Sequence, residues 1–269
     1  MKNQLQLIAL VSILMVIGGC SPQLKALNVV PKPEIETVEL ESLEVVSEII
    51  SSNYQPLAES LDAYLLDQSF NGVTLVASGD QIILLKAYGL AQVNEQEEMT
   101  VDHQFQIASV SKSFVAVSIL QLVEAGKLTL DQTIDKYFPD MPNAELITIH
   151  QLLTHTSGLY SGDDLTNYSQ VTTVDEIIAP AFKSSNLYYE EPGTYSIYSN
   201  LGYDVLGAII EQVSGQTYAD YIEEHVLIPA GMTQSGLNME GLVLENMATA
   251  YNGNISEGDE AKVLHPSFG

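Results

Sequence analysis

Residues 105–117 read Phe-Gln-Ile-Ala-Ser-Val-Ser-Lys-Ser-Phe-Val-Ala-Val, and they contain an S-x-x-K motif formed by Ser109 and Lys112. Apolar residues recur along this segment at the spacing of a helix face: Val110, Phe114, Val117 and Leu120. The pattern predicts an apolar helix that ends at Gly126, with Ser109 in its first turn. Residues three positions apart are neighbours on a helix, so Ser109 and Lys112 would share one face.

The pair of Ser109 and Lys112 has the composition of an activated nucleophile. A serine hydroxyl is a weak nucleophile unless a neighbouring base accepts its proton, and a lysine can be that base where burial lowers the lysine pKa by up to about 3–5 units. The apolar residues around Lys112 offer such burial. A motif this short also occurs by chance, so the catalytic interpretation needs a second signal.

The second signal is the triplet Tyr198-Ser199-Asn200, which is the only Y-x-N in the sequence. It stands directly before another apolar stretch, which predicts a helix that ends at Gly215. The apolar face of this helix is Leu201, Val205 and Ile209. The Asn200 side chain can donate and accept hydrogen bonds, so we expect it to contact Lys112 and a substrate amide.

Two further signatures occur in the same part of the chain. They read Leu-Leu-Thr-His-Thr-Ser-Gly-Leu at 152–159 and Pro-Gly-Thr-Tyr at 192–195. Together with the two motifs above, and in the same order, they resemble the serine hydrolases of the class C β-lactamase and penicillin-binding-protein type. The resemblance runs from about Gln55 to the last residue. It implies an α/β fold of the α+β type, with an antiparallel sheet flanked by helices and a mainly helical subdomain.

The resemblance also implies acyl transfer in two steps. Ser109 would attack a carbonyl carbon, Lys112 and the Tyr198 phenol would share the proton, and water would later release the acyl group. A phenol with a pKa of about 10 becomes a useful base only beside a cation, and Lys112 could be that cation. The sequence leaves both Lys112 and Tyr198 as candidates for the general base. The backbone N–H of Ser109, at a helix N-terminus, is the expected oxyanion donor.

The histidines indicate neither a base nor a metal site. His150 and His155 are five positions apart, which does not place both on one helical face, and neither H-E-x-x-H nor C-x-x-C occurs. We expect a structural, hydrogen-bonded role for His155, no bound metal and no cofactor.

The third motif of the resembled family is a Lys or His followed by Thr or Ser and Gly on a late strand. Nothing of this form occurs after Asn200. We therefore interpret the chain as C-terminally truncated, without the late sheet strands and without the second oxyanion donor. Such a chain would expose an unpaired apolar edge, so we expect residues 20–269 alone to be poorly soluble and nearly inactive.

The N-terminus has the pattern of an export signal. Residues 1–19 contain one positive charge, Lys2, and then an apolar run from Leu5 to Ile17 that is too short for a comfortable membrane span. The sequence Ile-Gly-Gly-Cys that ends at Cys20 resembles a bacterial lipoprotein cleavage box. Cys20 is therefore the expected lipidation site, and an incidental thiol behind an ordinary signal peptide is the alternative.

Three segments follow from this interpretation. Residues 1–19 are the expected lipoprotein signal peptide, residues 20–50 an acidic tether rich in Pro and Glu, and residues 51–269 the hydrolase domain. The lipid on Cys20 would anchor the protein to a bacterial membrane. Ser21, in place of an Asp, would permit sorting to the outer membrane, facing the periplasm, in a Gram-negative host.

The start of the domain predicts a helix and a hairpin. A helix should run from Pro56 to about Gln68, with apolar positions at Leu57, Leu61 and Leu65. Residues 72–78 and 81–88 are rich in Val, Ile and Leu and flank Gly79-Asp80, which predicts a hairpin with a two-residue turn. Their unbroken hydrophobicity predicts a sheet covered on both faces.

Composition excludes one class of partner. The 269 residues include 35 Asp and Glu against nine Lys and no Arg, so nucleic acid backbones would repel the chain. Two hypotheses remain: an exported serine hydrolase acting on a β-lactam, a D-alanyl peptide or a small ester, and a non-catalytic lipoprotein that binds peptidoglycan peptides or a protein partner. A pure binding protein has no need of a nucleophile beside a buried base, so Ser109 and Lys112 favour the first.

Overall fold

The computed structural model describes residues 48–50, 52–160, 178–179, 182–183, 187–188, 190–237 and 246–251. The expected signal peptide, Cys20 and most of the expected tether lie outside these residues. Among the helices that the structure does describe, none combines the length and the hydrophobicity needed to cross a membrane.

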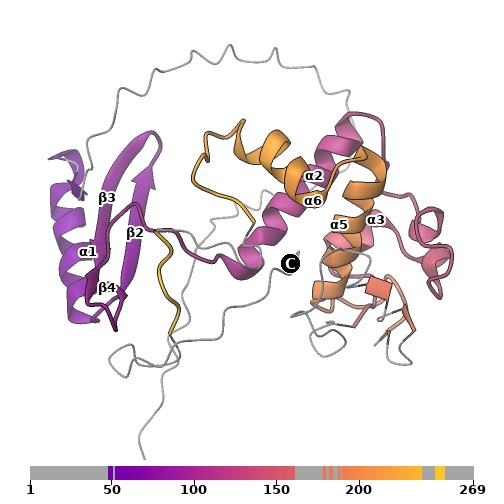
Figure 1. The fold of residues 1–269 in the computed structure, drawn as a ribbon, viewed down its shortest axis with the longest axis horizontal. Helices are drawn as coiled ribbons and strands as arrows, with labels where there is room; N and C mark the ends of the chain where they lie inside the picture. Colours follow the sequence, from indigo (N-terminus) through magenta and orange to yellow (C-terminus); the bar gives the residue numbers. More distant parts are fainter. Residues whose placement is uncertain are drawn as a thin grey trace, which may run out of the picture. The chain divides into compact units, whose positions relative to one another are not determined.

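An antiparallel sheet opens the described part of the chain. Its strands are β1 (Glu48–Ile50), β2 (Gly72–Ser78) and β3 (Gln81–Tyr88), in the order β1-β3-β2. Strands β2 and β3 form the hairpin predicted from the sequence, joined at Gly79-Asp80 (Figure 1). Gly79 has a φ of +56°, which glycine adopts without steric cost. Strand β1 takes up the last residues of the segment expected to be a tether.

Helix α1 (Gln55–Asp67) packs against β3 and is tied to it by an ion pair. The Asp62 carboxylate accepts hydrogen bonds from the Lys86 ammonium at 3.1 Å and from the Tyr88 hydroxyl at 2.8 Å. Burial raises the pKa of Asp62, but these hydrogen bonds and the charge of Lys86 outweigh burial and lower the pKa below its ordinary value. The carboxylate therefore stays charged and holds the helix on the sheet.

Burial on α1 and β2 differs from the prediction. On α1, Ala58 is fully buried, whereas Leu57 is 47% exposed, because the helix meets the sheet through a narrower stripe than its leucines suggest. On β2, Leu75 is 62% exposed, so the described residues do not cover both faces of the sheet. The prediction of two-sided cover was wrong, because apolar residues are common on protein surfaces and an unbroken run does not require burial.

A second, smaller sheet follows β3. It consists of β4 (Leu90–Gln92) and β5 (Glu97–Glu98), which pair antiparallel. The Thr249 N–H donates to the Ala91 carbonyl at 3.0 Å, so the last described segment, 246–251, lies beside β4.

The remaining helices build a hydrophobic core of their own. They are α2 (Lys112–Glu124), α3 (Ile149–Leu153), α5 (Asn200–Ser214), α6 (Tyr218–Ile222) and a π-helical turn, Glu223–Leu227. The short 3₁₀ turns are Ser52–Tyr54, Ala108–Ser111, Ile134–Lys136 and Ala144–Leu146. Helix α5 contacts α2, α3 and α6, and it ends before Gly215 as predicted, where φ is +78° (Figure 1). With the sheet, these helices give the α+β architecture that the sequence predicted.

The buried face of α2 is not the predicted one. Val117 and Leu120 are 44% and 49% exposed, whereas the residues that pack inward are Lys112, Val115, Ile119 and Leu122. Apolar residues lie on every side of this helix, so its own sequence does not select a face. The neighbouring helices select the face that carries Lys112.

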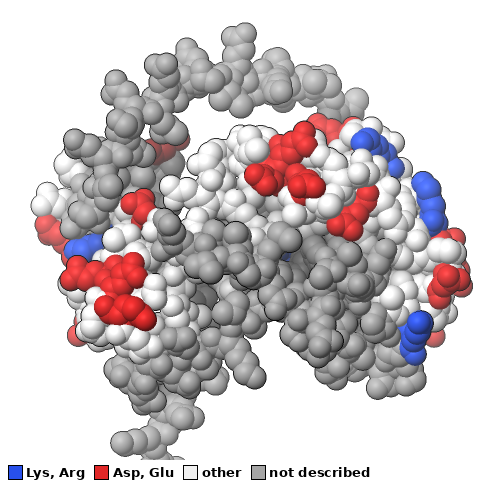
Figure 2. Space-filling view, viewed as in Figure 1, with Lys and Arg blue, Asp and Glu red and all other residues white. Residues whose placement is uncertain are grey.

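The surface of the protein is acidic. Figure 2 shows patches of Asp and Glu on the visible face that are larger than the patches of Lys. Only nine lysines occur in the sequence, and one of them, Lys112, is 6% exposed. A buried cation is costly unless it is paired, so the residues around Lys112 must stabilise its charge.

Candidate active site

Ser109 lies in the 3₁₀ turn Ala108–Ser111, which leads directly into α2. Ser109 is exposed at the surface. The preceding residue, Ala108, has a φ of +43°, a left-handed conformation that costs an L-residue roughly 1–2 kcal/mol. Such strain persists where the surrounding structure holds a functional group in a fixed direction. The turn therefore presents Ser109 to solvent while α2 itself continues into the core.

Lys112, the first residue of α2, supplies the buried charge of the site. Its Nζ donates to the Ser109 Oγ at 3.4 Å and to the Asn200 Oδ1 at 2.7 Å. The ring centres of Tyr198 and Tyr203 lie 4.9 Å and 5.5 Å from Nζ. Aromatic faces attract a cation, so the two rings and the amide oxygen together replace much of the water that the ammonium has lost.

Tyr198 is a second partner of the Ser109 side chain. Its hydroxyl donates to the Ser109 Oγ at 2.5 Å, and the tyrosine is 50% exposed. The Ser109 Oγ therefore has two titratable partners, a phenol and an ammonium, and the phenol is the nearer one. Once one of these partners has lost its own proton, it can accept the proton of the Ser109 hydroxyl as that hydroxyl attacks a carbonyl carbon.

Asn200 is placed by the start of α5. The helix is capped by Ser199, whose hydroxyl oxygen accepts from the Gly202 N–H at 3.0 Å while the hydroxyl donates to the Tyr160 carbonyl at 2.6 Å. The cap makes Asn200 the first residue of the helix, on the side of Lys112. The contact expected between Asn200 and Lys112 is present.

The segment after α3 packs closely on the segment before α5. A Cβ added to Gly158 would lie 2.1 Å from the Glu190 carbonyl oxygen, and Gly158 has a φ of +74°. Glycine suits this position on both grounds, since it has no side chain and favours positive φ. The Gly193 N–H donates to the Thr156 carbonyl at 2.7 Å. This close approach brings His155 to the site.

His155 lies directly behind Tyr198, a place that the sequence did not predict. Its ring centre is 4.6 Å from that of Tyr198 and 5.0 Å from that of Tyr203. Burial, and then the charge of Lys112, lower the pKa of His155, so its ring is neutral at neutral pH. The motif at 152–159 could have indicated this position, because it contains both His155 and Gly158, the glycine at which the two segments approach each other.

The structure thus brings together four residues that the sequence singled out. They are Ser109, Lys112, Tyr198 and Asn200. Cys20, the expected lipidation site, lies outside the described residues. In the part of the chain that the structure describes, no group of three or more His, Cys, Asp and Glu is placed to hold a metal ion.

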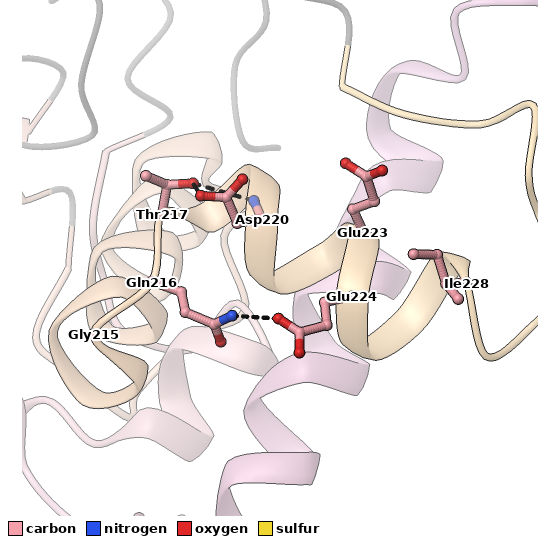
Figure 3. A pocket seen from close by; sticks show the side chains of 7 residues that line it. All are labelled: Gly215, Gln216, Thr217, Asp220, Glu223, Glu224 and Ile228. Carbon is pink, nitrogen blue, oxygen red and sulfur yellow. Dashed lines mark hydrogen bonds between the residues drawn. The ribbon is translucent and has the colours of Figure 1, made fainter.

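A separate hollow of about 540 Å³ lies at the other end of α5 (Figure 3). Its lining residues are Gly215, Gln216, Thr217, Asp220, Glu223, Glu224 and Ile228. At about 1.5 Å per residue, the two ends of α5 are roughly 20 Å apart. Polar groups of the hollow bond to one another, as Gln216 Nε2 does to Glu224 Oε2 at 2.6 Å. The hollow is therefore no part of the site around Ser109.

Comparisons with known sequences agree with this geometry. Residues 55–267 match the family model described as Beta-lactamase. The chain is 37% identical over 170 residues to penicillin-binding protein 4* of Bacillus subtilis, which covers 62% of this chain and 38% of that protein. It is 31% identical over 202 residues to protein flp of Staphylococcus aureus, which covers 72% of this chain and 39% of that protein. The chain spans less than half the length of both relatives.

Solved structures are similar to the chain as well. A penicillin-binding protein from Bacillus halodurans superposes with a TM-score of 0.63 at 30% identity, over 71% of this chain and 61% of that one. The D-amino acid amidase from Ochrobactrum anthropi SV3, solved with D-phenylalanine, superposes with a TM-score of 0.65 at 29% identity, over 74% and 57%. These likenesses confirm the β-lactamase/transpeptidase-like fold that the sequence motifs predicted.

Proposed function

Because this chain belongs to the β-lactamase family of serine hydrolases, we propose that it is an exported hydrolase that cleaves an amide or an ester through an acyl intermediate on Ser109. The observation that supports the proposal is the convergence of the Tyr198 hydroxyl and the Lys112 Nζ on the Ser109 Oγ. Nucleophile and base within hydrogen-bonding reach, with the base itself held by further groups, is the arrangement that nucleophilic catalysis requires.

In the proposed reaction, one of the two partners of Ser109 is first deprotonated, Tyr198 to a phenolate or Lys112 to an amine, and it accepts the Ser109 proton while Oγ adds to the carbonyl carbon. That partner then gives the proton to the leaving amine or alcohol as the bond to the leaving group breaks. The product is an ester between Ser109 and the acyl group, which water cleaves by the same two steps. Tyr198 is the nearer partner, at 2.5 Å against 3.4 Å for Lys112, which favours the phenol as the proton carrier. Lys112 would then stabilise the phenolate.

The similar proteins narrow the proposed substrate to small acyl compounds. Their names include a penicillin-binding protein and a D-amino acid amidase. We therefore propose a D-alanyl peptide, a related small amide or a small ester as the substrate. Efficient turnover of a β-lactam is the less favoured choice, because the motifs in this chain are the ones that all branches of the resembled family share.

Covalent labelling tests the proposal. The full-length protein and its Ser109→Ala variant are treated with a fluorescent fluorophosphonate and a fluorescent penicillin, and adducts are located by mass spectrometry. We expect an adduct on Ser109 in the wild type and none in the variant. Ser111→Ala is the matched control, because it removes a hydroxyl from the same turn, and it should label like the wild type. An adduct on Ser111 or Ser113 would contradict Ser109 as the nucleophile, and the absence of an adduct with any acyl donor would favour the non-catalytic binding protein instead.

We propose further that the protein is exported and anchored through Cys20. The support is the apolar run of residues 1–19, which ends in the Ile-Gly-Gly-Cys sequence. Cells that produce the wild type or Cys20→Ala are separated into membrane and soluble fractions. We expect the wild type in the membrane fraction and the variant in the soluble fraction, and an equal distribution of both would contradict the anchor.

A further inference from the structure

The proposed reaction leaves His155 without a role, although this residue holds the segment of Tyr198 in three ways. The Ile197 N–H donates to the His155 carbonyl at 2.8 Å, and the Ser199 N–H donates to the His155 Nδ1 at 3.2 Å. The imidazole also lies against the Tyr198 ring, with 4.6 Å between ring centres and 31° between planes. One residue thus holds a backbone N–H on each side of the tyrosine and also packs against the tyrosine ring.

We propose that His155 is a positioning residue whose backbone carbonyl and neutral ring together set the direction of the Tyr198 hydroxyl toward Ser109. The inference rests on the proposed function, because the direction of the phenol matters only if the phenol carries the Ser109 proton. Tyr198 is 50% exposed, so packing from one side alone must hold it. A displacement of about 1 Å at a reacting atom can cost roughly a hundredfold in rate, which is the scale of what the contacts protect.

The hydrogen bond from Ser199 requires His155 to be neutral. Nδ1 accepts a hydrogen bond only while it carries no proton, so the ring hydrogen must be on Nε2. The groups that face the ring are Lys112 from α2, Tyr198 from the preceding segment and Tyr203 from α5. Protonation would remove the acceptor and place a second cation near the lysine. The contact should therefore fail at acid pH.

Two substitutions separate the acceptor from the ring. In His155→Asn, the amide oxygen takes about the position of Nδ1, and asparagine tolerates the φ of +57° found here. In His155→Phe, an aromatic ring remains against Tyr198 but the acceptor is lost. The measurement is the rate of Ser109 acylation and turnover with p-nitrophenyl acetate, from about pH 5 to about pH 8 in the full-length protein.

We expect His155→Phe to lose roughly tenfold to a hundredfold in acylation rate at neutral pH, with kcat reduced more than KM is raised. His155→Asn should stay within about threefold of the wild type at neutral pH. As the pH falls below the ordinary histidine pKa value, its acylation rate should also decline less than that of the wild type, because asparagine does not titrate. His150→Asn is the matched control, since His150 is exposed on α3, and it should keep the wild-type rate and pH profile.

Acylation of His155→Phe at the wild-type rate would overturn the positioning role, and so would an unchanged acid decline in His155→Asn. Circular dichroism shows whether each variant is folded, and if His155→Phe is not, the pH profile of His155→Asn decides. A wild-type protein that is acylated at no pH would instead overturn the proposed function, and the positioning role with it.

Discussion

Helices α2 and α5 meet at the candidate active site, but they are buried in different ways. On α5, every residue from Leu201 to Ile210 is buried, including the acidic Asp204. On α2, only one face is buried, and Val117 and Leu120 remain 44% and 49% exposed. The neighbours of a helix that is enclosed on all sides fix its position, whatever the pattern of apolar residues in its sequence. A helix at the edge of a core buries only one of its faces. The site takes one group from each kind of helix.

The two helices supply different things to the site. From α2 comes the charged Lys112, and from the start of α5 comes Asn200, which accepts a hydrogen bond from that charge at 2.7 Å. If the enclosed helix gives a fixed frame and the edge helix gives the reacting charge, then the losses of activity caused by substitutions on the two helices should differ in kind. The following predictions test that division.

The largest effect is expected at Lys112. Lys112→Met keeps most of the apolar stem of the side chain but removes the charge, and it should slow the acylation of Ser109 by roughly 10²–10⁴-fold, the range of acid–base catalysis. Asn200→Ala should cost less, roughly tenfold to a hundredfold, because a hydrogen bond to a charged group contributes about 1.5–3 kcal/mol. Rates of labelling by a fluorophosphonate measure both. Equal losses would show that frame and reacting group cannot be separated in this way.

A pair of leucines tests the frame itself. Leu206→Ala on α5 removes a side chain with no exposed surface and should lower the free energy of unfolding by about 2–5 kcal/mol. Leu120→Ala on α2 removes the same atoms from a position that is 49% exposed and should cost less than about 1 kcal/mol. Denaturant unfolding of the two variants makes the comparison directly. Similar costs would mean that the outer face of α2 is covered in solution.

The smallest effect concerns His155, whose ring centre lies 5.0 Å from that of Tyr203 on α5. Because the pKa of His155 is lower in the folded protein than the ordinary value of 6.5, the unfolded chain binds more protons between the two pKa values. Stability is therefore lost as the pH falls below about 6.5 and through the folded pKa. Thermal melts of His155→Asn should decline less over that window than those of the wild type. A parallel decline would show that other groups cause the acid loss.

Much of the fold could be predicted because it depends on local chemistry. The hairpin follows from the Gly79-Asp80 turn, and the end of α5 follows from Gly215, whose positive φ suits glycine. Ser109 and Lys112 are three residues apart in the chain, so any helix brings them together. In motifs of this kind, the spacing of the residues in the sequence determines how they lie in the structure.

Other features could not be predicted, because partners distant in the sequence decide them. The inward face of α2 is set by the helices that pack on it, and its own apolar residues fit more than one face. The place of His155 depends on how the segment after α3 meets the segment before α5. Neither the periodicity of the apolar residues nor the spacing of the motifs predicts that contact.

That contact is possible because residue 158 is a glycine, which has no side chain. Gly158 touches none of the reacting groups, yet the Glu190 carbonyl lies where its Cβ would be. For the evolution of the protein, the site is thus more sensitive to substitution at this position without a side chain than at the exposed positions of α2. A population of random variants should retain changes at exposed Val117 and lose changes at Gly158 almost as completely as changes at Ser109.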